Sequence, residues 1–392
     1  MTGAFGNRLC ALILTGSLAR NEAAVEEADG TSKLLGDAEF LLVFADDSAL
    51  PRPGDVRHLA QEIEARLARH GVAGSMDLDA IHPSFLRALK PHIFAYELRK
   101  CGHVVWGDQG ILNLIPPFTA ADIPLEDAWR LLCNRMIEQL EVAPELGAQH
   151  IILPPAVHYR TVKLYRDMAT SFLIFTGGYE PTYRGRAERL NSMSADPSEK
   201  RGLPFPLIDF SNRVSACTGF MLQGRWDGLH NQTASCPPSF AFWQEAISQA
   251  RLLWRWELMR LTGGDASLSD QGLMETWMKM QPVRDRLRGW AYVLRECGWR
   301  RSWREWPRWL RLAWRASPRY CVYSAATRIL FDLPSILDAR AGTPATTNPE
   351  FNSICSWLPA NHGDHRASAP RWVQAVSAVS WNYLHFLKGT RA

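Results

Sequence analysis

The spacing of apolar residues in this chain changes near Gly107, and that change limits the folds open to it. After Gly107, Pro116 and Pro117 begin a linker, beyond which apolar residues recur every three to four positions, as in helices. Before it, runs of strand character alternate with polar or amphipathic segments, the runs being residues 9–15, 39–44 and 72–81. The pattern predicts an α+β fold, with an N-terminal mixed sheet and helices followed by a mainly α-helical domain.

The same patterns divide the chain of 392 residues into a first domain at residues 1–115 and an α-helical domain at 116–392. Two stretches rich in glycine, proline and polar residues, around 179–239 and 340–370, predict loop insertions in the second domain. We expect its long helices at residues 125–142, 157–176, 240–262 and 272–316.

Composition narrows the class of protein. A hydrophobic content of 46% with 21% charged residues is ordinary for a globular chain, which excludes wholesale disorder and a fibrous architecture. The net charge of +4 does not support a nucleic-acid partner, although a local basic surface stays open. The eight cysteines are scattered, so neither a zinc site nor a disulfide framework is expected. Apolar runs are too short for a signal peptide or a membrane span, which predicts a cytoplasmic protein.

The first run of strand character ends at Gly16 and Ser17, where the chain turns polar. Glycine lacks the side chain that would block a close approach, so backbone N–H groups and the Ser17 hydroxyl are expected to bind phosphate. Arg20 follows in the same segment. Its guanidinium either contacts a triphosphate or pairs with Glu22 or Asp37, and the sequence favours neither.

Carboxylates follow at two predicted strands. Asp37 and Glu39 stand two residues apart at the head of one strand, so their side chains leave the same face. Repulsion between them is relieved by a hard divalent cation, which predicts Mg²⁺ or Mn²⁺ at this point. The next strand carries Asp77 and Asp79, and one of them is expected to supply a third carboxylate. Their register against the following segment favours Asp77 as the third metal ligand.

This ordered set of motifs resembles the polymerase-beta-like nucleotidyltransferase superfamily. Gly-Ser-x-Ala-Arg at residues 16–20 is similar to its minimal and antibiotic branch, in which glycine is more usual at the position of Asn21 and serine at that of Gly36. Residues 102–108 resemble the closing strand of that domain, so the resemblance covers roughly residues 7–110. It implies a small mixed sheet with helices on one side, facing a larger helical domain across a substrate cleft.

The resemblance also implies a reaction. A nucleoside triphosphate, with ATP favoured, would bind at Gly16 and Ser17 and transfer its nucleotidyl group to an acceptor hydroxyl that Asp77 or Asp79 helps to deprotonate. A small molecule such as an aminoglycoside is slightly favoured as acceptor over a protein side chain or an RNA end. The alternative is a non-catalytic nucleotide-binding protein that retains the fold. Oligomeric state has no signal in the sequence.

Lys163 belongs to the second predicted domain and stands one helical turn before Asp167. The favoured interpretation is a surface ion pair. The resemblance offers another, in which Lys163 reaches the triphosphate, as lysines from helical domains do in several members. Close by, packing within a loop is favoured over stacking on a base or sugar for Tyr179, Tyr183, Arg184 and Arg186.

Residues 299–315 concentrate tryptophan and arginine. At helical spacing, one face collects Trp303, Trp306, Leu310 and Trp314 while the arginines lie elsewhere. A buried core helix is the favoured interpretation. A helix on an anionic membrane surface and a face that stacks on RNA are the alternatives. The histidines at 362 and 365 are expected in a solvent loop rather than at a metal.

Overall fold

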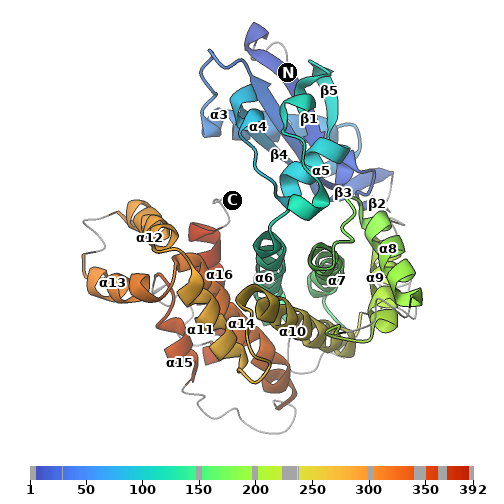
Figure 1. Cartoon of the computed structure of the whole chain (residues 1–392). Coiled ribbons are helices and arrows are strands. Elements are labelled where there is room, and N and C mark those ends of the chain that lie inside the picture. The colour runs from blue at the N-terminus through green and yellow to red at the C-terminus, as the bar shows by residue number, and fades with distance from the viewer. Residues whose placement is uncertain are drawn as a thin grey trace. The chain divides into compact units, whose positions relative to one another are not determined.

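The computed structural model of the chain divides into two compact units, each of which is described by itself (Figure 1). The first comprises Met1–Ala128, Leu173–Arg201 and Leu207–Cys236, and the second Trp129–Phe172, Gly202–Pro206 and Pro237–Ala392. The structure describes residues 6–28, 30–146, 152–196, 202–222, 236, 238–298, 303–339, 350–360 and 369–387.

A five-stranded mixed sheet organises the first unit around β3 (Thr31–Phe44). Along one edge β3 pairs antiparallel with β2 (Val25–Ala28) and β1 (Leu9–Thr15), and along the other it pairs parallel with β4 (Val72–Ile81). Strand β5 (His103–Gly107) joins β1. The predicted α+β class and strand bounds are therefore confirmed, except that β3 begins at Thr31 rather than near residue 39.

Helices cover both faces of this sheet, which corrects the expectation of helices on one side. Alternation along β3 sends Leu41 and Val43 to the face packed by α4 (Pro83–Arg87) and α5 (Ile93–Cys101). Leu42 and Phe44 point the other way, against Val56 and Ala60 of α3 (Pro53–Ala68). Because both faces are buried, the end of β3 is apolar without interruption, which is typical of a strand with helices on both sides.

The region expected as a loop insertion at 179–239 contains two helices, so that prediction is wrong. Helix α8 (Tyr183–Ala195) begins where the Thr182 hydroxyl accepts from the Gly185 N–H, and it packs on α9 (Leu207–Leu222). Glycine, arginine and serine dilute the apolar period of α8, which hid it in the sequence. Of the second expected insertion, residues 340–349 and 361–368, including both histidines, lie outside the described residues; α15 (Glu350–Cys355) lies between them.

The remaining helices confirm a mainly helical second part. Predicted helices at 125–142 and 240–262 are present with those bounds, whereas Pro282 and the left-handed Gly298 divide the predicted helix 272–316 into three. In the described ranges no helix is long and apolar enough to cross a membrane. The helices are α6 (Leu125–Val142), α7 (Pro155–Phe175), α10 (Phe240–Thr262), α11 (Asp270–Met280), α12 (Val283–Cys297), α13 (Trp306–Arg315), α14 (Pro318–Ala339) and α16 (Arg371–Phe386).

The helical unit has an aromatic core. Trp129 is fully buried, with Trp277 and Tyr323 meeting its ring edge-on at 6.0 and 5.7 Å between centroids. Such large side chains bury much apolar surface per residue.

The described chain also contains short helical turns. They are η1 (Gly6–Arg8), α2 (Gly16–Ala19), η2 (Ile111–Leu114), η3 (Ala120–Asp122) and η4 (Ala143–Glu145).

Candidate functional site

Gly16 lies directly against the carboxylate of Glu39. The antiparallel ladder of β1 and β3 pairs Thr15 with Glu39, and Gly16 then leaves the strand with a φ of 70°. A Cβ at this position would lie 2.8 Å from the carboxyl carbon of Glu39, closer than real Cβ atoms come to such neighbours. The positive φ therefore favours glycine, and any side chain at this position would displace the carboxylate of Glu39.

Asp37, Glu39 and Asp77 come together through strand register. Residues 37 and 39 share one face of β3, and the parallel ladder places Asp77 opposite Glu39 and Ser75 opposite Asp37. Asp79 is opposite Leu41, a core residue that is only 3% exposed. The register therefore places the backbone positions of Asp37, Glu39 and Asp77 beside one another at the exposed end of the sheet face that α5 covers, with Asp79 nearer to the core.

Ser75 gives Asp37 a hydroxyl partner from the neighbouring strand. Its hydroxyl donates to the Asp37 carboxylate. Position 36, where the resembling family more often has serine, is glycine in this chain, and a Cβ there would meet nothing within 4 Å. A hydroxyl contact to the first carboxylate is thus present, although it comes from β4 instead of from the preceding residue.

The donor set at this end of the sheet is made of carboxylate and hydroxyl oxygens, which suits a hard divalent cation such as Mg²⁺. The space beside Gly16, which a Cβ would fill, is where the Glu39 carboxylate lies. Among the residues that the structure describes, no three His, Cys, Asp or Glu side chains are grouped so that they already hold a metal ion. These oxygen donors suit Mg²⁺, and the carboxylate side chains would have to rotate toward the ion to coordinate it.

Arg20 is held inside the first unit. Its Nη1 donates to Oε2 of Glu97 at 2.7 Å, its Nε lies 3.4 Å from Oε2 of Glu22, and its guanidinium stands 5.0 Å from the ring centre of Tyr183. The side chain is 6% exposed. These contacts support the structural interpretation of Arg20, pairing with Glu22, over contact with a triphosphate. The neighbouring Ser17 contributes its carbonyl to the turn, where it accepts from the Glu22 N–H.

Asn21 adopts the left-handed conformation, with a φ of 57°, and is the non-glycine residue in the described chain that does so. Glycine reaches this region without strain, and asparagine tolerates it better than most other residues. The position at which the resembling family more often has glycine is therefore one at which this backbone requires a residue that accepts a positive φ.

Sequence reasoning missed Glu97, which organises a buried network behind the turn. Glu97 accepts from Arg20, from Arg186 and from the Tyr179 hydroxyl at 2.6 Å. Arg186 is buried, with its guanidinium 4.8 Å from the ring centre of Tyr179 and 4.6 Å from that of Tyr183. These contacts agree with packing for Tyr179, Tyr183 and Arg186, but Tyr183, Arg184 and Arg186 belong to α8 instead of the predicted loop, and Arg184 is exposed. No local pattern in the sequence identifies Glu97 as the partner of Tyr179 and Arg186.

Lys163 lies in the second unit, among charged residues of α6 and α7. Arg135 pairs there with Asp167 and with Glu138. The positive charge of Arg135, together with burial, lowers the pKa of Lys163 to about 8, although Glu138 and Asp167 oppose the change. Asp167 is buried, so the prediction that Lys163 and Asp167 form an ion pair on the exposed surface is wrong.

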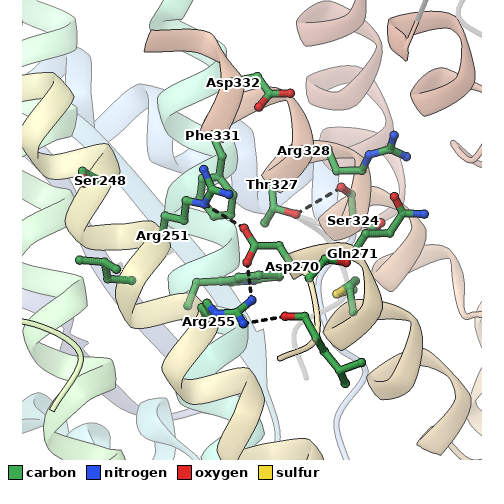
Figure 2. Close-up of a pocket in the computed structure, with 15 residues that line it drawn as sticks. Ser248, Arg251, Arg255, Asp270, Gln271, Ser324, Thr327, Arg328, Phe331 and Asp332 are labelled. Carbon is green, nitrogen blue, oxygen red and sulfur yellow. Dashed lines mark hydrogen bonds and ion pairs between the residues drawn. The ribbon is translucent and has the colours of Figure 1, made fainter. Parts of the chain in front are cut away.

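The helical unit also contains a cavity of about 710 Å³, lined by α10, α11 and α14. Figure 2 shows Asp270 at its centre, where one carboxylate oxygen accepts from Arg251 and the other from Arg255, both at 2.8 Å. Arg255 also donates to the carbonyls of Ala266 and Leu268. None of the site residues predicted from the sequence lines this cavity.

Compared with known proteins, the chain matches no family model, no curated protein and no solved structure. The features of the chain that point to a function are therefore the motif residues and the strand register that joins them.

Proposed function

We propose that the first unit is a nucleotidyltransferase that moves a nucleoside monophosphate from a nucleoside triphosphate to an acceptor hydroxyl. The observation that carries the proposal is the surroundings of Glu39. Asp37 shares its face of β3, Asp77 stands opposite it on β4, and the backbone of Gly16 lies against its carboxylate. Carboxylates on neighbouring strands beside a glycine turn can serve a charged phosphate substrate only together with a cation.

Asp37 and Glu39 would hold Mg²⁺, with Asp77 as a third ligand or as the base. When bound, the ion would neutralise charge on the triphosphate. The acceptor oxygen forms a bond to the α-phosphorus, the bond from that phosphorus to the bridging oxygen breaks, and pyrophosphate leaves. Asp77 takes the proton of the acceptor hydroxyl. Gly16 leaves the room that the phosphates and the Glu39 carboxylate need.

The second function is nucleotide binding without transfer. It is favoured by the arrangement of the carboxylates, because no ready-made group of three metal ligands occurs in the described ranges. The Ser75 hydroxyl also donates to Asp37, one of the two carboxylates that would hold the ion. Tight nucleotide binding with no pyrophosphate release from any acceptor would support this function.

The deciding experiment measures pyrophosphate release from each of four ribonucleoside triphosphates, with Mg²⁺ or Mn²⁺, across aminoglycosides, proteins and short RNAs. We expect release that needs an acceptor and falls by orders of magnitude in Asp37→Asn/Glu39→Gln. The matched control is Asp55→Asn/Glu62→Gln, because both carboxylates are exposed on α3 of the same unit. Equal release by the two double variants would refute the assignment of the site.

A further inference from the structure

The stripe of apolar side chains along α13 is exposed, which corrects the favoured interpretation of a buried core helix. Trp306, Leu310 and Trp314 recur every four residues, and their side chains are 38%, 65% and 80% exposed. Trp303, in the turn before the helix, is 61% exposed. We call these four residues the tryptophan stripe. Residues 299–302 of the predicted segment lie outside the described residues.

A different face of α13 attaches the helix to the unit. Trp309 and Leu312 are buried, and the centroid of the Trp309 ring lies 6.1 Å from that of the Trp290 ring on α12. The Trp309 Nε1 donates to the carbonyl of Pro359 at 2.6 Å. Figure 1 shows α12 and α13 side by side in orange. Because α13 is anchored through these other residues, the exposed tryptophan stripe is not needed to hold the helix on the unit.

Arginines border the stripe. Arg304, Arg311 and Arg315 are exposed, whereas the one acidic residue of this stretch, Glu305, is paired with Arg308 at 2.8 Å. Arg308 is itself held by the carbonyls of Ser356 and Leu358. The charge that remains at the surface beside the stripe is therefore positive.

We propose that the tryptophan stripe and its arginines bind an anionic lipid surface, with α13 lying in the plane of the interface. Tryptophan places an apolar ring and a polar N–H at the boundary of a bilayer, and arginine is attracted to anionic headgroups. An amphipathic helix with tryptophan and leucine on one face and arginine on the other is the usual form of such a contact.

The composition of the stripe favours lipid over RNA. Leu310 lies at its centre and is 65% exposed, and an aliphatic side chain adds insertion into acyl chains but no stacking on a base. The surface lies in the second compact unit, whereas the proposed nucleotidyl transfer depends on the first. Failure of one proposal therefore leaves the other intact.

The experiment is co-sedimentation of the full chain with vesicles of phosphatidylcholine alone or with phosphatidylserine added. We expect binding to the anionic vesicles, weaker on the order of tenfold with phosphatidylcholine alone, and reduced at high salt. Leu310→Gln/Trp314→Gln and Arg304→Glu/Arg311→Glu should each lower partitioning by about tenfold. Because these side chains are exposed, circular dichroism should show a native fold in both.

Matched controls change equivalent residues elsewhere. Ile208→Gln/Leu384→Gln removes two exposed apolar side chains, and Arg57→Glu/Arg69→Glu reverses two exposed charges, one on α3 and one directly after it. Both should partition like the wild type. The proposal is overturned if the stripe variants also partition like the wild type, or if the wild type does not bind anionic vesicles. Binding of single-stranded RNA that the stripe variants alone abolish, without binding of vesicles, would assign the surface to RNA instead.

Discussion

Asp77 lies opposite Glu39 in the parallel pairing of β3 with β4, two residues before Asp79, which lies opposite the buried Leu41. The two aspartates share a face of β4, so only this register separates them. Asp77 is exposed and Asp79 is half-buried. The register therefore favours Asp77 as the carboxylate that works with Glu39.

Under the proposed function, Asp77→Asn should lower kcat by roughly 10²–10⁴-fold, the usual loss for a general base. Asp79→Asn should lower kcat by less than about tenfold, because Asp79 lies two residues further along β4, toward the core. Rates of pyrophosphate release across pH measure both, with nucleotide affinity as a check that binding is retained. Equal losses, or a larger loss at Asp79, would contradict the order given by the register.

Gly16→Ala should destabilise the first unit by about 1–2 kcal/mol, because alanine is strained at a positive φ, and the new Cβ would displace the Glu39 carboxylate. Urea unfolding measures the change in free energy. Gly219→Ala is the control, since this glycine lies inside α9 with open space at its Cβ position. Alanine at 219 should be neutral or slightly stabilising. Similar changes in the free energy of unfolding at the two positions would contradict the strain expected for alanine at Gly16.

Asn21 offers a test of backbone conformation, because the residue is exposed and has a positive φ. Asn21→Gly should leave the free energy of unfolding almost unchanged, whereas Asn21→Ala should cost about 1 kcal/mol, because alanine reaches a φ of 57° only with strain. Chemical denaturation of the two variants side by side gives the comparison. If alanine is tolerated as well as glycine, the turn does not require a left-handed residue.

Glu97→Gln should destabilise the first unit by about 3 kcal/mol. The change leaves Arg186 buried without its carboxylate partner and weakens the bond from Arg20. Thermal and urea unfolding measure the loss. Glu188→Gln, an exposed carboxylate on α8, is the control and should be within about 0.5 kcal/mol of the wild type. A loss at Glu97 no larger than at Glu188 would argue against a structural network.

Glu257 of α10 makes the stability of the helical unit depend on pH. It is fully buried with no hydrogen bond to either carboxylate oxygen, and burial raises its pKa to about 8, while the nearby Ser171 hydroxyl acts in the opposite direction. Between the unfolded value near 4.5 and about 8, the folded state keeps a proton that the unfolded state releases. The wild type should therefore lose stability as pH rises through this range, by at most about 1.4 kcal/mol per unit from this group.

Glu257→Gln removes this titration. Its free energy of unfolding relative to the wild type should rise from pH 5 to pH 8, as measured by urea unfolding at several pH values. Glu245→Gln, on the same helix but only half-buried, is the control for the loss of a carboxylate from α10. A Glu257→Gln difference that stays constant with pH would show that Glu257 is ionised in the folded protein.

Local sequence patterns predicted much of the framework. The bounds of β1 and β4, and of α6 and α10, agree with the apolar spacing, because that spacing repeats with the period of the element that buries it. The same reasoning placed Asp37 and Glu39 on one face, since alternation is a property of the strand itself. Helix α8 was missed because its apolar residues are too sparse to show the period.

The sequence by itself determined which residues share a strand or a helix face, because those relations repeat within a few residues of backbone. Only the tertiary structure decided what meets each face. The register of β3 with β4 set Asp77 opposite Glu39, and Arg20 met Glu97, 77 residues away. The tryptophan stripe shows the same division: its spacing defined the face, but whether another element covers that face depends on packing between helices, which no local period encodes.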